Sequence, residues 1–334
     1  MRLNFKLISL PVTVVIISFY LGLATSSVSG ADVDQKSLGA QLSLLRQEAL
    51  GSGIQQTTLD SALEELEPVS GVIELDNNQP EAKLTFDQYL GRILSEDRIA
   101  RGRKRLKDSR RLLAKIAKAY GVQPRFLVAL WGVETDFGRT TGSFPVIDSL
   151  VSLVYDGRRS SFFRKELFHA LRILDEGHIS LARMRGSWAG AMGQLQFMPS
   201  TFRLFAVDFD GDGRIDIWES KEDVFASAAN YLSQSGWKRG QTWGQQVLLP
   251  EGADVSPAKL KEAKRASDWL ALGVSTVDGS DFFLPDSLSS IVQPEGLTGR
   301  SFLVYNNYHV IYKWNRSENF ALSVGILSDR IGDL

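Results

Sequence analysis

The sequence contains no cysteine among its 334 residues. Disulfides, a thiolate nucleophile, thiolate metal ligands and a lipid-modified cysteine are therefore excluded. Histidine is rare as well: His169, His178 and His309 are scattered and match no metal-ligand spacing. H-E-x-x-H, G-x-S-x-G and the Walker loop are missing, so zinc peptidases, serine hydrolases and nucleotide-binding proteins lack their signatures here. A formal net charge of -1 gives no basis for binding nucleic acid, and no motif indicates an organic cofactor.

The first thirty residues have the layout of a secretory signal. A basic start precedes an apolar run, Leu7–Ala24, and small residues follow it at Thr25–Gly30. The apolar run is somewhat short for a helix that spans a membrane. We therefore expect residues 1–30 to be removed, leaving a soluble periplasmic protein that starts near Ala31, has no membrane span and is not a lipoprotein. The alternative is an uncleaved anchor.

The residue patterns predict a mostly helical α+β chain. Apolar residues at helical spacing dominate residues 31–120, in which 97–120 is predicted as one basic helix with a solvated charged face and 68–80 as an extended connection. Residues 121–245 form the predicted core, and residues 246–334 a small β-rich part with a last helix. The runs assigned to an antiparallel sheet are Val274–Val277, Phe282–Leu284, Phe302–Tyr305 and His309–Trp314, and the last helix covers Asn319–Ile331.

The stretch Pro124–Gly138 predicts a helix that carries an acid on its apolar face. Proline is favoured in the first turn of a helix, and the glycine that follows the last apolar residue is a stop signal. Glu134 lies four residues after Leu130 and three after Trp131, which places it on one apolar stripe. Desolvation of a carboxyl raises its pKa and makes a proton donor available near neutral pH. The alternative is a buried glutamate paired with an arginine.

The stretch Gly186–Pro199 combines small residues with neutral hydrogen-bonding groups and an aromatic ring. Its glycines and alanines let the backbone approach a ligand or another helix closely. Ser187 and Gln196 supply neutral polar groups, and Phe197 supplies a stacking face. This combination suits a sugar. The alternative is tight helix packing with ordinary polar exposure.

Residues 208–219 match the twelve-residue calcium loop D-x-D-x-D-G-x5-E at every specified position. Three carboxylates within five residues would repel one another without a cation, and their hard oxygens suit Ca²⁺. The predicted ligands are Asp208, Asp210, Asp212, Arg214 through its carbonyl, Glu219 and Asp223. Whether Glu219, Glu222 or Asp223 closes the shell is left open, and an acidic surface loop without an ion is the alternative. A single loop favours a structural role for calcium over a switch.

Three ordered motifs resemble the lytic murein transglycosylase B family. They are VETDFG at Val133–Gly138, GSWAGAMGQLQFMPS at Gly186–Ser200 and DFDGDGRIDIW from Asp208, and the match extends from about Leu84 to the C-terminus. The resemblance implies a lysozyme-like, mostly helical core with an added helical region, an EF-hand-type calcium loop and a small antiparallel β part. It also implies cleavage of the β-1,4 bond between N-acetylmuramic acid and N-acetylglucosamine in peptidoglycan, with formation of a 1,6-anhydromuramyl end. The implied partners are peptidoglycan glycan strands and wall-synthesis enzymes.

The resemblance also assigns roles to individual residues. Glu134 is the implied acid and base, and Ser187 orients it or the acetamido group of the substrate. The positions that match the substrate-binding cleft of the family are Tyr89, Arg158, Arg159, Ser187, Gln196, Phe197, Tyr231 and Asn315. Trp314 and Phe320 stand where the family has tyrosine, so two phenol hydroxyls are missing.

A single acid agrees with this implied reaction. Ordinary glycosidases use two carboxylates, whereas Glu134 has no evident partner carboxylate in the sequence. One glutamate can protonate the leaving oxygen and then accept the proton of the sugar's own C6 hydroxyl, which attacks from within the substrate. Three alternatives are kept: a hydrolytic muramidase, a catalytically silent glycan-binding scaffold and, as the weakest, a calcium sensor.

Overall fold

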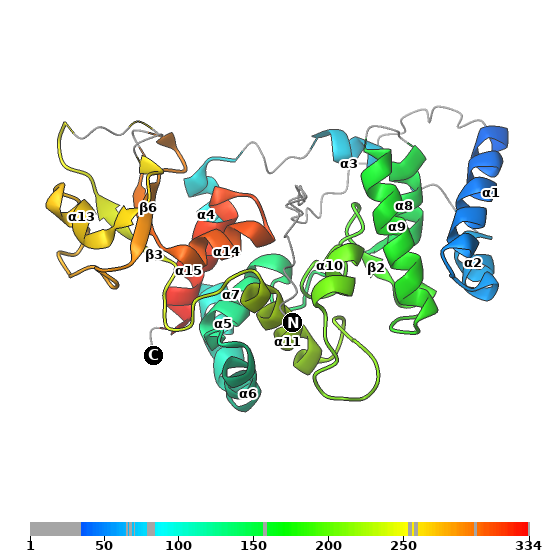
Figure 1. Ribbon diagram of the computed structural model, residues 1–334, viewed down its shortest axis with the longest axis horizontal. Coiled ribbons are helices and arrows are strands. Elements are labelled where there is room, and N and C mark those ends of the chain that lie inside the picture. Colours follow the sequence, from blue (N-terminus) through cyan, green and yellow to red (C-terminus); the bar gives the residue numbers. More distant parts are fainter. Residues whose placement is uncertain are drawn as a thin grey trace, which may run out of the picture.

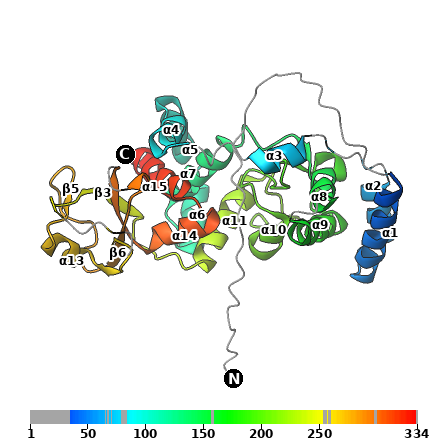
Figure 2. The same cartoon turned by 90° about the horizontal axis from the view of Figure 1, so that it is seen from above.

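The computed structural model describes residues 35–332 apart from 65, 67–68, 70, 79–83, 156–158, 253–255, 257–259 and 297–298. The predicted signal segment and Arg158 lie outside the described residues. Within the described residues, no helix combines the length and the apolar character needed to cross a bilayer. The molecule is elongated, with the sheet and the short helix α13 (Ala266–Ala271) at one end, two helices at the other and the remaining helices between them (Figure 1). The view from above has the same order (Figure 2).

The helices at one end cover a helical pair further along the chain. Helices α1 (Gln35–Gly51) and α2 (Gln56–Leu63) lie beside α9 (Ser160–Asp175), which packs against α8 (Val146–Tyr155). Residues 72–78 form helix α3 (Val72–Asn78), so the prediction of an extended connection over 68–80 is wrong for these residues. Helix α3 also contacts α8. Val72 and Asp76 are both buried, whereas Glu74 between them is exposed. A strand would put all three residues on one face, but a helix puts only Val72 and Asp76 together.

The basic segment forms two helices where one was predicted. Helix α4 (Phe86–Ile93) begins with a capping box between Thr85 and Gln88. It is followed by α5 (Glu96–Asp108) and α6 (Arg110–Tyr120), which are separated at Ser109. The break allows α6 to turn onto α11 (Lys221–Gln234), against which it packs, while α5 packs on α7 (Pro124–Thr135). Sequence periodicity continues across Ser109 and therefore did not indicate the change of direction.

Helix α7 forms the centre of the molecule. Its residues 126–132 are all buried, so the helix is enclosed on every side and does not have the single apolar stripe that was predicted. It contacts α5, α6, α11 and α15 (Glu318–Gly332), and the last of these confirms the predicted final helix. The main core includes residues from all three predicted regions, whose boundaries after 120 and 245 stay a prediction.

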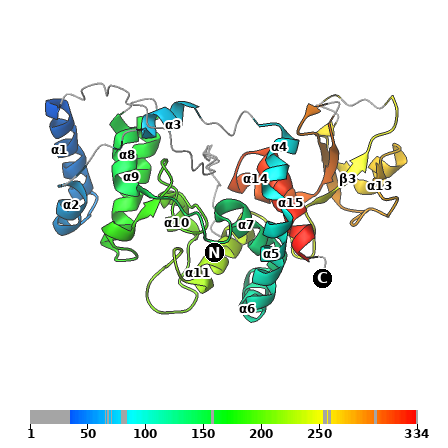
Figure 3. The same cartoon turned by 180° about the vertical axis from the view of Figure 1, so that it is seen from behind.

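Helix α14 (Asn306–Trp314) replaces a predicted strand. It packs against α15 and α11, as the view from behind shows (Figure 3). The prediction of a strand over His309–Trp314 is wrong, because Asn307, Val310, Ile311 and Trp314 are buried at the i, i+3, i+4, i+7 spacing of a helix. Aromatic and β-branched residues in this short segment had suggested a strand.

The antiparallel sheet is confirmed, although with different strands. Its strand order is β4 (Lys264–Arg265), β6 (Leu288–Val292), β7 (Ser301–Val304), β3 (Gly244–Leu248) and β5 (Ser275–Thr276). Helix α13 (Ala266–Ala271) and the sheet share a second, smaller core. Strand β7 was predicted, whereas β3 and β6 were not. These two strands contain glutamines and serines, which hid the apolar pattern typical of a strand. Residues 282–284 form no strand, and only two residues of the predicted Val274–Val277 run do.

Candidate active site

Glu134 is the penultimate residue of α7 and is half-buried. The helix ends at Thr135, earlier than predicted, because Asp136 (φ 51°), Phe137 (φ 63°) and Gly138 (φ 81°) adopt left-handed backbone conformations in succession. Phe137 tolerates this conformation because its ring is buried, edge-on to Trp131 at 5.6 Å between ring centroids. The turn leaves Glu134 at the free end of an otherwise enclosed helix.

An indole N–H and an aromatic wall lie next to Glu134. Trp314 Nε1 donates a hydrogen bond to Glu134 Oε1 at 2.7 Å. The Trp314 ring lies 5.1 Å from Phe197 and 4.8 Å from Tyr231, measured between ring centroids. Burial raises the pKa of Tyr231 to about 12, and its hydroxyl donates to the carbonyl of Lys313 at 2.9 Å. Phe197 is only 2% exposed. The sequence predicted a ring open to stacking with a sugar, but in the structure this ring supports Trp314 instead.

The Gly186–Pro199 stretch forms a folded loop held against α7. It begins with a two-strand ladder between β1 (Phe144–Pro145) and β2 (Arg185–Gly186), preceded by the 3₁₀ turn Leu181–Arg183, and ends at α10 (Pro199–Phe205). The Ser187 hydroxyl is buried and accepts the N–H of Ala191 at 2.9 Å. Ser187 therefore shapes its own loop in this structure.

Gln194 joins this loop to two other parts of the molecule, a role that the sequence analysis missed. Its side chain accepts from Trp131 Nε1 at 2.8 Å and donates to the carbonyl of Trp218 at 2.6 Å. Its carbonyl accepts from the hydroxyl of Thr135, the residue after Glu134, at 2.8 Å. Polar residues in a glycine-rich stretch gave no signal that one of them cross-links helix, loop and calcium motif.

Two side-chain oxygens of predicted substrate-binding residues are buried without a hydrogen-bond partner. They are Oε1 of Gln196 and Oδ1 of Asn315. The amide nitrogen of Gln196 donates to the carbonyls of Thr141 and Gly193 at 2.9 and 3.0 Å. An unpaired buried acceptor costs free energy, and both oxygens retain the capacity to accept a hydrogen bond.

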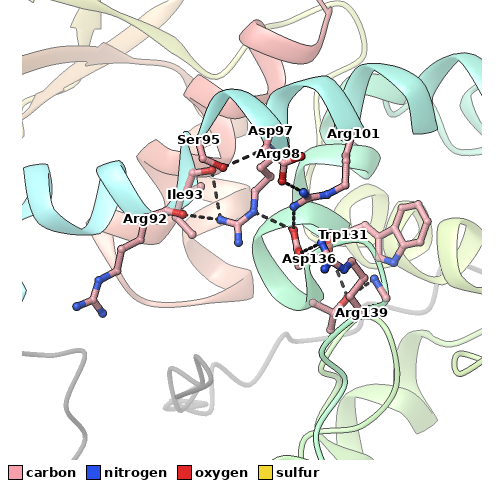
Figure 4. Close-up of polar contacts among 11 residues, drawn as sticks. Arg92, Ile93, Ser95, Asp97, Arg98, Arg101, Trp131, Asp136 and Arg139 are labelled. Carbon is pink, nitrogen blue, oxygen red and sulfur yellow. Dashed lines mark hydrogen bonds and ion pairs between the residues drawn. The ribbon is translucent and has the colours of Figure 1, made fainter. Parts of the chain in front are cut away.

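Asp136 is the centre of an ion-pair cluster (Figure 4). Arg98 Nε lies 3.1 Å and Arg101 Nη2 2.6 Å from its Oδ1, and Arg139 Nη1 lies 3.2 Å from its Oδ2. Burial alone would raise the pKa of Asp136, but the hydrogen bonds from the Arg101 and Arg98 guanidinium groups outweigh it and lower the pKa. The prediction that these two arginines only line a solvated helix face is therefore wrong.

The remaining predicted glycan-binding residues are tied into the fold. Tyr89 is 5% exposed on α4. Arg159 forms an ion pair with the buried Asp76 of α3, and its guanidinium lies 4.8 Å from the centroid of the Phe163 ring. The structure thus gives Arg159 an internal partner, which the sequence could not reveal because Asp76 is 83 residues away.

The predicted calcium ligands lie in the loop between α10 and α11, except Asp223, which is in the first turn of α11. One carboxylate oxygen from each of Asp208, Asp210 and Asp212 lies within 4.8 Å of the others, a donor set that fits a hard cation. Asp223 is buried, and its two oxygens accept the N–H groups of Phe209 and Asp216, both at 2.7 Å. Glu219 instead pairs with Arg183 at 2.6 Å.

Comparison with known proteins adds independent findings. A family model described as "Transglycosylase SLT domain" matches residues 38–329. The membrane-bound lytic murein transglycosylase B of Escherichia coli K12 is 28% identical over 291 residues, which are 84% of this chain and 79% of that protein.

Solved structures give the same result. SltB3 from Pseudomonas aeruginosa in complex with NAG-NAM-pentapeptide is 41% identical with a TM-score of 0.85, and the match covers 89% of this chain and 80% of that one. The E. coli lytic transglycosylase Slt35 in complex with calcium is 26% identical with a TM-score of 0.75, covering 87% and 92% of the two chains.

Proposed function

Because this chain belongs to the transglycosylase SLT family, alongside the lytic murein transglycosylases, it is an enzyme that cleaves peptidoglycan, and we propose that Glu134 alone supplies its acid and its base. The observation that carries this proposal is the contrast between the two neighbouring carboxylates. Glu134 lies beside Trp314 and the aromatic wall, whereas Asp136 is bound by three arginines. Asp136 is therefore unsuited to serve as the second carboxylate of an ordinary glycosidase.

The proposed reaction moves one proton out and one proton back. Protonated Glu134 gives its proton to the glycosidic oxygen as the bond between that oxygen and C1 of the N-acetylmuramic acid unit breaks. The C6 hydroxyl of the same sugar then bonds to C1, and its proton passes to the Glu134 carboxylate. The products are an N-acetylglucosamine end with a free hydroxyl and a 1,6-anhydromuramyl end. Since the nucleophile belongs to the substrate, no positioned water is required.

The unpartnered oxygens of Gln196 and Asn315 support a role in holding the glycan. An acetamido N–H or a sugar hydroxyl would satisfy an acceptor that otherwise stays buried and unpaired. Ser187 and Phe197 contribute through the shape of the loop and the support of Trp314, while Tyr89, Arg158, Arg159 and Tyr231 remain proposed cleft residues. We propose export to the periplasm on the predicted signal segment, with peptidoglycan strands as the substrate.

We also propose that the 208–219 loop binds Ca²⁺ as a structural ion. The clustered oxygens of its three aspartates support this, because like charges so close together are destabilising without a cation. Gln194 connects the loop to α7 through the carbonyl groups of Ile217 and Trp218. Loss of calcium should therefore weaken the support of the active site without altering the chemistry.

Mass spectrometry of the fragments released from purified peptidoglycan tests the function. The wild-type protein should give muropeptides lighter by one water than those released by a hydrolase, and Glu134→Gln should release none while still binding the glycan. Hydrated products would establish the muramidase alternative, and a wild-type protein that binds without cleaving would establish the scaffold. Full activity of Glu134→Gln would refute the single-acid mechanism.

A further inference from the structure

We infer that Trp314 is a positioning residue for Glu134: its indole N–H holds Oε1 of the carboxyl group and so assigns the catalytic proton to Oε2. This inference rests on the proposed role of Glu134 as acid and base. It concerns a residue that differs from the tyrosine of the family pattern, so it is a property of this chain.

The geometry fixes the donor firmly. Trp314 is the last residue of α14 and is 6% exposed, and its Nε1 lies 2.7 Å from Glu134 Oε1. Phe197 and Tyr231 pack against its ring, and the Tyr231 hydroxyl binds the carbonyl of the preceding residue, Lys313. The indole therefore cannot turn away without disrupting this aromatic packing.

The chemistry of indole gives the contact a direction. An indole N–H can only donate, so Oε1 must offer it a lone pair in both protonation states of Glu134. When Glu134 is an acid, its proton is then favoured on Oε2, because the carbonyl oxygen of a carboxyl group is a better acceptor than its hydroxyl oxygen. A tyrosine hydroxyl at this position could donate or accept, and would not impose this choice.

The same contact favours the carboxylate that the second half of the reaction needs. Glu134 lies in the last turn of α7, where the helix dipole disfavours a negative charge. A hydrogen bond to a charged acceptor is roughly twice as strong as one to a neutral acceptor, so the indole opposes this effect. Trp314 thereby helps Glu134 to act as a base after it has acted as an acid.

The first test compares Trp314→Phe with the wild type in the pH dependence of kcat/KM. Loss of the N–H should raise the pKa of Glu134, so the alkaline limb, where the acid loses its proton, should move up by about one unit. The value of kcat at the optimum should fall about tenfold or more, because the carboxyl is less well placed.

Trp243→Phe is the matched control. Trp243 is also buried, and its Nε1 donates to Asp329 Oδ2 at 2.8 Å. Asp329 pairs with Arg125 in the first turn of α7, at the opposite end of that helix from Glu134. Trp243→Phe should lower the melting temperature without moving the alkaline limb, which separates the loss of an indole–carboxylate bond in general from its loss at Glu134.

A second measurement follows the Trp314 indole itself, with the aromatic residues around it unchanged. In ¹⁵N NMR spectra, the Trp314 indole N–H resonance should titrate with the same midpoint as the alkaline limb, and this titration should vanish in Glu134→Gln. Trp314→Tyr should restore much of kcat relative to Trp314→Phe.

The outcomes separate the two proposals. An indole resonance that does not respond to pH or to Glu134→Gln would overturn the inference, as would an unchanged pH profile in Trp314→Phe. If Glu134→Gln is inactive in either case, the proposed function stands without it. An active Glu134→Gln would refute the proposed function itself.

Discussion

Replacing Asp136 by asparagine should destabilise the protein far more than the same change at Asp97. Both carboxylates pair with Arg101, and Figure 4 shows them on opposite sides of its guanidinium. Asp136 has 16% of its side chain exposed and also binds Arg98, which is 18% exposed. Asp97 has 76% of its side chain exposed, so water screens its pairing. Asparagine has almost the same shape as aspartate, and the comparison therefore isolates the charge.

The magnitude follows from burial. Removing one partner of a buried ion pair costs about 3–5 kcal/mol, because the remaining charge stays desolvated. The Asp136 cluster is partly exposed, and asparagine keeps one acceptor oxygen, so we expect a loss of about 2–3 kcal/mol in the free energy of unfolding. Asp97→Asn should cost less than about 1 kcal/mol.

The pH dependence gives this prediction its sign. The pKa of Asp136 lies below its ordinary value of 3.8 in the folded protein, so the carboxylate contributes stability above pH 3.8. That contribution is lost as the pH falls through the folded-state pKa, because the protonated side chain resembles asparagine. Urea unfolding curves at neutral and acidic pH measure the effect. The reasoning would be refuted if Asp136→Asn and Asp97→Asn lost equal free energy of unfolding. It would also be refuted if the difference in stability between Asp136→Asn and the wild type did not become smaller in acid.

Two further predictions concern the support of the site. Chelation of calcium should lower the melting temperature without changing the reaction product. The reason is that an ion at about a hundredfold its dissociation constant stabilises the fold by about 2.7 kcal/mol. If the melting temperature does not rise when calcium is returned to the stripped protein, that result would argue against the site. Gly142→Ala should cost at least about 3 kcal/mol and most of the activity, because its Cβ would lie 2.0 Å from the carbonyl oxygen of Gly186, next to Ser187. Gly240→Ala is the control, because Gly240 also has a positive φ but a Cβ there would meet nothing within 4 Å. Thermal unfolding should show that this variant loses only about 1–2 kcal/mol of stability. A similar loss of stability in both variants would contradict the expected clash.

The sequence was informative where a short motif carries its own chemistry. The helix around Glu134, the mostly helical composition and the sheet near the C-terminus were predicted from local patterns, and the motifs identified the family correctly. Calcium binding by residues 208–219 stays a prediction, and the three aspartates of this loop do converge. In each case the relevant residues lie within one turn or one loop.

Errors arose where burial, not propensity, selected the structure. Residues 306–314 contain β-branched and aromatic side chains, yet they form α14 because one helical face packs against α11 and α15. The basic stretch was predicted as one helix because its periodicity does not show the bend at Ser109, which lets α6 reach α11.

The partners of the acid were decided by tertiary structure alone. The sequence by itself predicted a helix that carries Glu134 on an apolar face, with no evident partner carboxylate in its motif. Only the fold brings Trp314 to it from 180 positions away, and only the fold commits Asp136 to Arg98 and Arg101, which a sequence pattern assigns to solvent. A hydrogen bond or an ion pair depends on distances of about 3 Å, and chain packing sets those distances for residues far apart in sequence.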